Sequence, residues 1–418
     1  MKRGTKRLTA LLLAAGIVFS LTACAPAGRT DLMEGVEPSV VRSEPELQEP
    51  GRAAVADFGL RLLRQSAGTG ENLLFSPLSV VTALAMTGNG AERETREEVY
   101  RTLGMDPEQL NAFLHDYLDT LTGEEGGMLH AANSIWFTDD PAFTVQEDFL
   151  QTNADYYGAE LYRLPMNDAA CGKINRWVKE QTVGMIPEIV KELPEDTIMC
   201  LVNALAFEGE WPEPYEKNQI REEAFTTRSG EPVNTDFMYG EDHLYLENQW
   251  CRGFLKPYRG GRYAFGALLP EEGTTVAELV DKLDGEGLCA LLADPEEVTV
   301  HTVIPKFETE YSAELSELLK DMGMPLAFDP ERAQLGGLGK YEGGNIWIDQ
   351  VLHKTFLSMG EKGTRAGAAT AVVVNGEGAA PDEQEPKEVR LDRPFLYMLV
   401  DLENQLPFFL GTMEVPEG

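Results

Sequence analysis

Hydrophobic and polar positions along the chain predict a group of helices first and most of the strands afterwards. From Val55 to Leu62, apolar residues recur at the spacing of one helix face, which predicts an amphipathic helix. Ser76 followed by Pro77 is typical of a helix start, because serine caps free backbone N–H groups and proline fits the first turn. Similar patterns predict helices over residues 92–103, 107–121, 145–158, 170–183, 276–283 and 313–321.

Strands are predicted where apolar residues alternate or form short continuous runs. These stretches are residues 128–137, 197–207, 253–258, 263–269, 298–304, 351–358 and 395–402, and a last apolar run, 407–415, closes the chain. Helices followed by strands indicate an α+β fold with large sheets rather than an alternating βαβ arrangement.

The first residues have the pattern of an export signal. Four basic residues precede an apolar run, 8–21, that is too short to span a bilayer, so residues 1–23 are predicted to be a signal peptide. Leu21-Thr22-Ala23-Cys24 resembles the lipobox of bacterial lipoproteins, which implies that Cys24 carries a lipid. The alternative is an ordinary signal peptide with an incidental cysteine. We expect an exported protein, lipid-anchored at the bacterial cell surface or extracellular.

Two further segments follow the predicted signal peptide. Residues 24–50 combine several prolines with scattered glutamates and show no apolar period, which predicts a flexible tether. No second linker interrupts residues 51–418, so we expect them to form one domain.

Charge and composition exclude several classes of function. The net charge is −35, and acidic residues outnumber basic ones by 70 to 35, which argues against binding to nucleic acid. The same charge disfavours electrostatic attachment to an anionic membrane, so attachment needs the lipid. No HExxH or GxSxG pattern is present, so we expect neither an enzyme nor a cofactor. The cysteines after Cys24 lack CxxC spacing and are predicted to be buried free thiols without a metal: Cys171, Cys200, Cys251 and Cys289.

One long segment does not read as part of a packed core. Residues 363–392 are rich in alanine, glycine, glutamate and proline, and predicted strands flank them on both sides. Loops of this length are usually functional or disordered. The segment is therefore the first candidate for a functional element.

Several motifs, taken in order, resemble the serpin family of protease inhibitors. The run from Val389 to Leu399 resembles the signature that follows the serpin reactive loop. Further matches are the runs at residues 72–79, 133–136, 174–178, 182–184, 201–211 and 351–354, so that the resemblance covers about residues 52–416. It implies a serpin fold with a large mixed central β-sheet, additional sheets, about nine helices and an exposed reactive-centre loop. It also implies a monomer that traps a target serine protease in a covalent complex.

The residues after Glu361 have the composition that strand insertion requires. A serpin is cleaved in its loop, and the freed loop then enters the main sheet as a new strand, so inserting residues must be small. The hinge implied by the resemblance consists of Glu361, Gly363, Thr364, Arg365, Ala366, Gly367, Ala368, Ala369 and Thr370. Arg365 stands where the family usually has an acidic residue. Alternation points it outward on insertion, so we expect it to be tolerated.

The family's usual spacing from Glu361 places the cleaved bond at Glu377-Gly378. The loop is longer than in well-known members, so Gly376, Ala379 and Ala380 remain candidates. Cleavage after glutamate fits a protease with a basic pocket, and cleavage after alanine fits an elastase-like enzyme. Trypsin-like targets are disfavoured because the basic residues near the end of the loop stand too close to the next strand. The acidic loop favours a cationic target through its field.

The resemblance also assigns two internal polar sites. Ser76, Ser79, Asn203 and His353 map to the shutter, a hydrogen-bonded cluster under the main sheet that controls strand separation. Trp211 and Glu361 map to the breach, where insertion begins. Two alternative functions remain: a non-inhibitory surface binding protein with the serpin fold, and an inhibitor of cysteine proteases.

Overall fold

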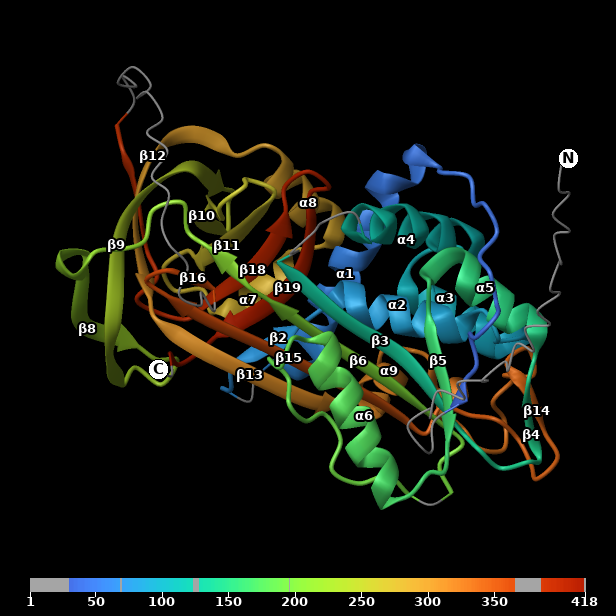
Figure 1. Cartoon of the computed structure of the whole chain (residues 1–418). Coiled ribbons are helices and arrows are strands. Elements are labelled where there is room, and N and C mark those ends of the chain that lie inside the picture. Colours follow the sequence, from blue (N-terminus) through green and yellow to red (C-terminus); the bar gives the residue numbers. More distant parts are fainter. Residues whose placement is uncertain (1–29, 68–69, 123–127, 195, 365–384, 417–418) are drawn as a thin grey trace, which may run out of the picture.

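The computed structural model describes residues 30–67, 70–122, 128–194, 196–364 and 385–416 (Figure 1). Within this part, nine α-helices and three sheets confirm the predicted α+β class. The helices are α1 (Gln48–Ser66), α2 (Pro77–Gly88), α3 (Arg93–Leu103), α4 (Pro107–Thr122), α5 (Glu147–Tyr157), α6 (Asp168–Gln181), α7 (Val276–Lys282), α8 (Gly285–Ala293) and α9 (Ser316–Asp321). Short 3-10 helices are η1 (Pro45–Leu47), η2 (Lys217–Gln219) and η3 (Pro325–Phe328).

The main sheet, called sheet A here, contains eight strands in the described residues. Its strands are β1 (Thr30–Asp31), β5 (Glu160–Leu164), β3 (Leu129–Thr138), β6 (Met199–Phe207), β15 (Gln350–Gly360), β16 (Gly363–Thr364) and β7 (Gly209–Glu210), in that order, with β13 (Phe307–Glu314) on β15. The two central strands, β6 and β15, are parallel and pair from Gln350↔Cys200 to Phe356↔Ala206. The sheet is therefore mixed, and no strand separates β6 from β15 over this stretch.

A second sheet of nine strands, called sheet B here, packs behind sheet A. It contains β17 (Lys387–Arg390), β12 (Glu296–Pro305), β9 (Pro232–Glu247), β10 (Cys251–Pro257), β11 (Tyr263–Pro270), β18 (Phe395–Asp401), β19 (Leu406–Met413) and β2 (Leu73–Phe75), with β8 (Ile220–Thr226) on β9. A small third sheet joins β14 (Gly339–Tyr341) to β4 (Phe143–Val145).

Two hydrophobic layers cover the faces of sheet A. One core cluster joins the back of sheet A to sheet B and to helices α1 to α5. A smaller cluster lies between the other face and α6, which crosses in front of the sheet (Figure 1). Because β6 is covered on both sides, all nine of its residues are buried. This explains why its sequence is a continuous apolar run rather than an alternating one.

Residues 30–47 correct the prediction of a flexible tether over 24–50. Instead of being free, they lie against the domain: β1 pairs with β5, and the Ser39 N–H donates to Asp155 Oδ1 at 2.6 Å. The Ser43 hydroxyl and the Glu44 N–H both donate to Asp116 Oδ2 at 2.9 Å. An edge strand offers unpaired backbone groups to any nearby segment, and such contacts leave no apolar period in the sequence. Of the other residues predicted as tether, 48–50 begin helix α1, and 24–29 lie outside the described residues.

Candidate functional site

The start of the predicted hinge already occupies a strand position in sheet A. β16 lies between β15 and β7, with Met359↔Thr364 and Gly360↔Gly363 on one side and Gly363↔Glu210 and Thr364↔Gly209 on the other. Because β7 follows β6 in the chain, β16 stands at the end of the β6–β15 boundary. Residues 360–364, called the hinge turn from here on, therefore mark the point at which a new strand would enter.

Gly363 and Thr364 fit this narrow position for different reasons. Gly363 has φ +139°, and a Cβ there would overlap the carbonyl oxygen of Gly209, so only glycine lets the strands approach. Thr364 is fully buried, and its hydroxyl hydrogen-bonds the hydroxyl of Tyr258. Residue size at both positions is thus limited by packing that exists before any cleavage.

Trp211, one of the two predicted breach residues, binds the backbone of the hinge turn. The indole N–H of Trp211 donates to the Gly360 oxygen at 3.0 Å, and its backbone N–H donates to the Lys362 oxygen at 2.9 Å. The indole also stacks on Tyr258, with ring centroids 4.5 Å apart and planes at 4°. Trp211 therefore binds the backbone of the hinge turn through two hydrogen bonds, one from its ring and one from its own backbone.

Glu361 ties the same turn to a third element. Its carboxylate lies 3.1 Å from Lys306 Nζ, and Lys306 also lies 3.4 Å from Asp236. The pKa of Glu361 is lowered by a hydrogen bond from its own backbone N–H and by Lys306, which favours the charged form. The structure therefore brings the two predicted breach residues, Trp211 and Glu361, to the same turn.

The four predicted shutter residues lie in one hydrogen-bond network, which includes Asn133 as well. The Ser76 N–H donates to His353 Nε2 at 3.3 Å, and His353 Nδ1 lies 2.6 Å from Asn203 Oδ1. The amide of Asn203 donates to Ser79 Oγ at 2.5 Å and to Asn133 Oδ1 at 2.8 Å, and Ser79 Oγ donates to Asn133 Oδ1 at 2.7 Å. The network joins the start of α2 to β3, β6 and β15, so it crosses the β6–β15 boundary.

His353 is held as a neutral side chain. Its Nε2 accepts from a backbone N–H, so the proton of the ring lies on Nδ1 and is donated to Asn203. The ring is 1% exposed, and burial lowers its pKa to about 3. Protonation would place an N–H against the N–H of Ser76, so the network requires the neutral form.

Asp349 is a contact at the far end of the boundary that sequence reasoning missed. Its Oδ2 accepts from the N–H groups of Ile198 and Met199 at 2.8 and 3.0 Å, which joins the residue before β15 to the start of β6. Burial raises the pKa of Asp349 to about 6. Only its position immediately before a predicted strand could have pointed to it. Tyr258 and Asn133 were likewise missed as site residues, because their partners are far away in sequence.

Other predicted site residues lie outside the described residues. These are Cys24, the hinge positions Arg365, Ala366, Gly367, Ala368, Ala369 and Thr370, and the candidate cleavage positions Gly376, Glu377, Gly378, Ala379 and Ala380. The chain is described again before β17, where Lys387 and Arg390 are part of a strand that pairs with β12. Arg390 is ion-paired with Glu223 and Asp392.

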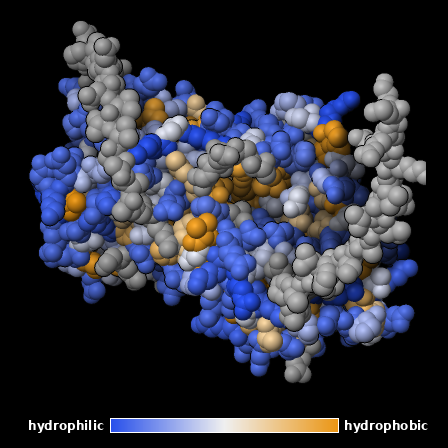
Figure 2. Space-filling model, in the orientation of Figure 1, coloured by the Kyte–Doolittle hydropathy of each residue, from blue (hydrophilic) through white to orange (hydrophobic). Residues whose placement is uncertain are grey.

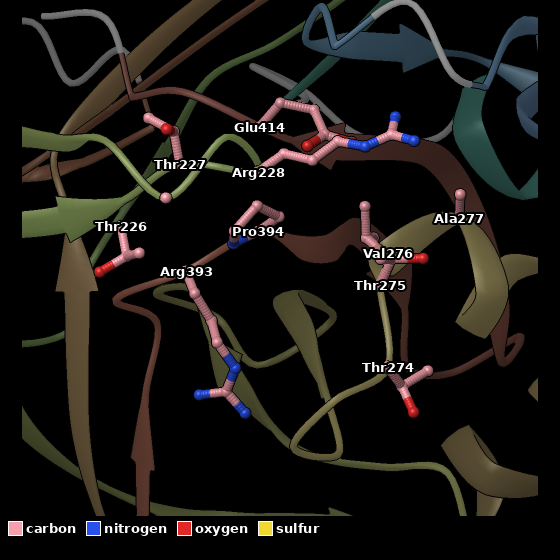
Figure 3. A pocket seen from close by; sticks show the side chains of 11 residues that line it. Thr226, Thr227, Arg228, Thr274, Thr275, Val276, Ala277, Arg393, Pro394 and Glu414 are labelled. Carbon is pink, nitrogen blue, oxygen red and sulfur yellow. The ribbon is translucent and has the colours of Figure 1, made fainter.

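Other described features lie away from the hinge turn. A pocket of about 310 Å³ lies between the β8–β9 turn, the start of β18 and the start of α7, and its lining includes Arg228, Arg393 and the buried Glu414 (Figure 3). Among the described residues, no cluster of histidine, cysteine and carboxylate side chains is arranged to hold a metal ion. The four described cysteines are free thiols, and Cys171, Cys200 and Cys251 are buried as predicted, whereas Cys289 is partly exposed. No described helix combines the length and apolar character needed to cross a membrane.

Comparison with known proteins shows which family the chain resembles. The family model for serpin (serine protease inhibitor) matches residues 53–416. A serpin-like protein of Thermococcus kodakarensis is 32% identical over 379 residues, covering 88% of this chain and 87% of that protein. Human antithrombin-III is 27% identical and covers 85% of this chain and 78% of its own length.

Solved structures agree with the sequence comparisons. The native-state crystal structure of the thermophilic serpin Tengpin superposes with a TM-score of 0.85 at 37% identity. The match covers 93% of this chain and all of that one. The chain therefore belongs to the serpin family of serine protease inhibitors.

Proposed function

We propose that the protein is an inhibitory serpin that traps serine proteases by inserting its cleaved loop between β6 and β15. The observation that carries this proposal is the hinge turn, whose residues Gly363 and Thr364 already pair with β15 and β7. Insertion then extends an existing two-residue strand, which avoids the cost of starting a new one. The small residues that follow Thr364 in the sequence support continuation of that strand.

We propose an elastase-like or glutamate-cleaving protease as the target, and disfavour trypsin-like enzymes. Lys387 and Arg390 are the basic residues nearest the end of the loop, and both belong to β17, where a protease cannot bind an extended substrate. The loop carries acidic residues, and hydrophilic side chains predominate on the face shown in Figure 2. An acidic inhibitor attracts a cationic protease and accelerates encounter.

Incubation of the exported protein with neutrophil or pancreatic elastase tests this function. We expect a complex that survives SDS, together with a released C-terminal peptide whose mass identifies the cleaved bond. Cleaved protein should also resist heat better than intact protein, because insertion adds a strand to sheet A. Clean digestion by elastases and glutamate-cleaving proteases, with no complex and no gain in heat resistance, would show that the protein is a non-inhibitory member.

We propose that a lipid on Cys24 holds this inhibitor at the cell surface as a monomer. The support is the basic start, the short apolar run and the tetrapeptide that ends in Cys24. Cys24→Ser is expected to move the protein from the membrane fraction to the medium, measured by sedimentation and immunoblotting. Cys289→Ser is the matched control and should remain with the membranes. Retention of Cys24→Ser in the membrane fraction would contradict the anchor.

A further inference from the structure

A buried lysine lies behind the hinge turn. Lys256 on β10 is 9% exposed, and its Nζ lies 3.0 Å from Asp242 Oδ1 on β9. The other oxygen of Asp242 accepts a hydrogen bond of 2.8 Å from the Thr302 hydroxyl on β12. Burial alone would lower the pKa of Lys256, but Asp242 and Tyr215 raise it above the ordinary value, so the side chain keeps its charge.

The stability of the fold does not by itself explain this ion pair. Removing two charges from water has a large cost, and a buried pair often stabilises a protein no better than apolar residues of the same size. A buried pair is informative where it fixes the position of something else. The neighbours of Lys256 show what that is.

The ammonium group of Lys256 faces two aromatic rings. Nζ lies 5.1 Å from the ring centroid of Trp211 and 5.1 Å from that of Tyr215, within the range of cation–π attraction. These are the residues whose backbones bind the hinge turn: Trp211 N–H donates to the Lys362 oxygen at 2.9 Å, and Tyr215 N–H donates to the Glu361 oxygen at 2.8 Å. Lys256 thus contacts two residues, Trp211 and Tyr215, each of which binds the hinge turn directly.

We propose that Lys256, held by Asp242, is a positioning residue for loop insertion. It fixes the rings of Trp211 and Tyr215, and through them it keeps the hinge turn at the end of the β6–β15 boundary. This inference rests on the inhibitory function proposed above. Among the described residues, Lys256 is ion-paired with Asp242 and not with the hinge turn, so its effect on the turn passes through the two rings.

Positioning matters because trapping is a competition between two rates. After the loop is cut, the acyl-enzyme either hydrolyses, which frees the protease, or the loop inserts first, which traps it. If the hinge turn is not held at the end of the β6–β15 boundary, loop insertion is slower. More acyl-enzyme is then hydrolysed, so more inhibitor molecules are consumed for each protease trapped. Glu361 and Lys306 still hold the turn from another side, so we expect a partial loss of efficiency.

The test separates positioning from stability with a double variant. Lys256→Met or Asp242→Asn alone leaves a buried group without its partner, and either is expected to lower heat stability. Lys256→Met with Asp242→Asn removes both charges and is expected to unfold close to the wild-type temperature. The cation–π attraction to the two rings is nevertheless lost. We expect the number of inhibitor molecules consumed per elastase to rise about 3- to 10-fold, and the amides of Trp211 and Tyr215 to exchange hydrogen at least about 10-fold faster.

A matched control makes the same chemical changes elsewhere. Lys320 on α9 pairs with Glu317 at 2.7 Å and lies 5.6 Å from the ring of Phe328, away from the hinge turn. Lys320→Met with Glu317→Gln should leave both measurements unchanged.

Two results would overturn the proposal. One is wild-type consumption and wild-type amide exchange in the Lys256/Asp242 double variant. The other is a rise in consumption that only follows a matching loss of heat stability. If the wild-type protein traps no protease, the inhibitory function fails by itself, and the exchange rates of Trp211 and Tyr215 still decide whether Lys256 positions the turn.

Discussion

Thr364→Arg is expected to convert the protein from an inhibitor into a substrate. Thr364 is fully buried between β15 and β7, and its hydroxyl bonds Tyr258, so an arginine there has no partner and no room. Burying an unpaired charge costs about 3–5 kcal/mol. In the uncleaved variant the end of the hinge turn can leave β15 and β7 and keep the arginine in water, but insertion would bury it. The insertion rate should then fall about 100- to 4,000-fold, since each 1.4 kcal/mol changes a rate tenfold. Elastase should cleave the loop and leave no SDS-stable complex.

The conservative change Thr364→Ser serves as the control for this experiment. It keeps the hydroxyl that faces Tyr258 and should preserve most of the complex. The intact Thr364→Arg protein must also show a cooperative thermal transition, which shows that the loss concerns insertion rather than folding. Formation of complex at the wild-type yield by Thr364→Arg would mean that insertion does not require residue 364 to be buried between β15 and β7.

Acid is expected to destabilise the shutter through His353. Burial lowers the pKa of its imidazole to about 3, whereas the unfolded chain binds a proton near pH 6.5. The stabilisation is thus complete above pH 6.5 and is lost as the pH falls towards 3, at about 1.4 kcal/mol per pH unit. Urea unfolding midpoints measured from pH 7 to pH 4 should fall more steeply for the wild type than for His353→Gln, which binds no proton there.

Asp349 titrates over part of the same range with the opposite sign. Because burial raises its pKa to about 6, its contribution to stability is present at low pH and is lost as the pH rises from about 4 to 6. Both proteins in the comparison contain Asp349, so its effect cancels in their difference. Parallel pH profiles for wild type and His353→Gln would show that the histidine is not held neutral.

The sequence could predict local elements better than contacts between them. The pattern over 107–121 predicts α4 (Pro107–Thr122) closely, because the apolar face of a helix depends only on residues within one short segment. The helix predicted from residue 313 begins instead at Ser316, because β13 extends to Glu314 and pairs there with Leu352. That pairing depends on a strand that is distant in sequence. Likewise, the apolar patterns do not predict β8 and β9, because many residues of both strands are exposed and polar.

The candidate site shows the same division. Periodicity could not have connected Ser76 with His353, and only the resemblance to serpin motifs placed both in one cluster. Asn133 belongs to the motif at residues 133–136, yet its role in the network follows from its pairing with Asn203 across β3 and β6. The Lys256–Asp242 pair has no motif at all. Such contacts arise from the arrangement of sheets, which patterns along one strand do not contain.

The place of β1 has a consequence for what happens to a captured protease. Thr30 pairs with Arg163, Arg163 with Phe137, and Phe137 with Met199, so the first described residue lies in line with the beginning of β6. β16 lies at the opposite end, beside Gly209, so the insertion proposed above would begin there and run towards Met199. With a lipid on Cys24, at most about 20 Å of chain separates Thr30 from the bilayer. With both proposals, the lipid anchor and loop insertion, inhibition would then draw the enzyme from the pole beside Gly209 towards the pole nearest the membrane.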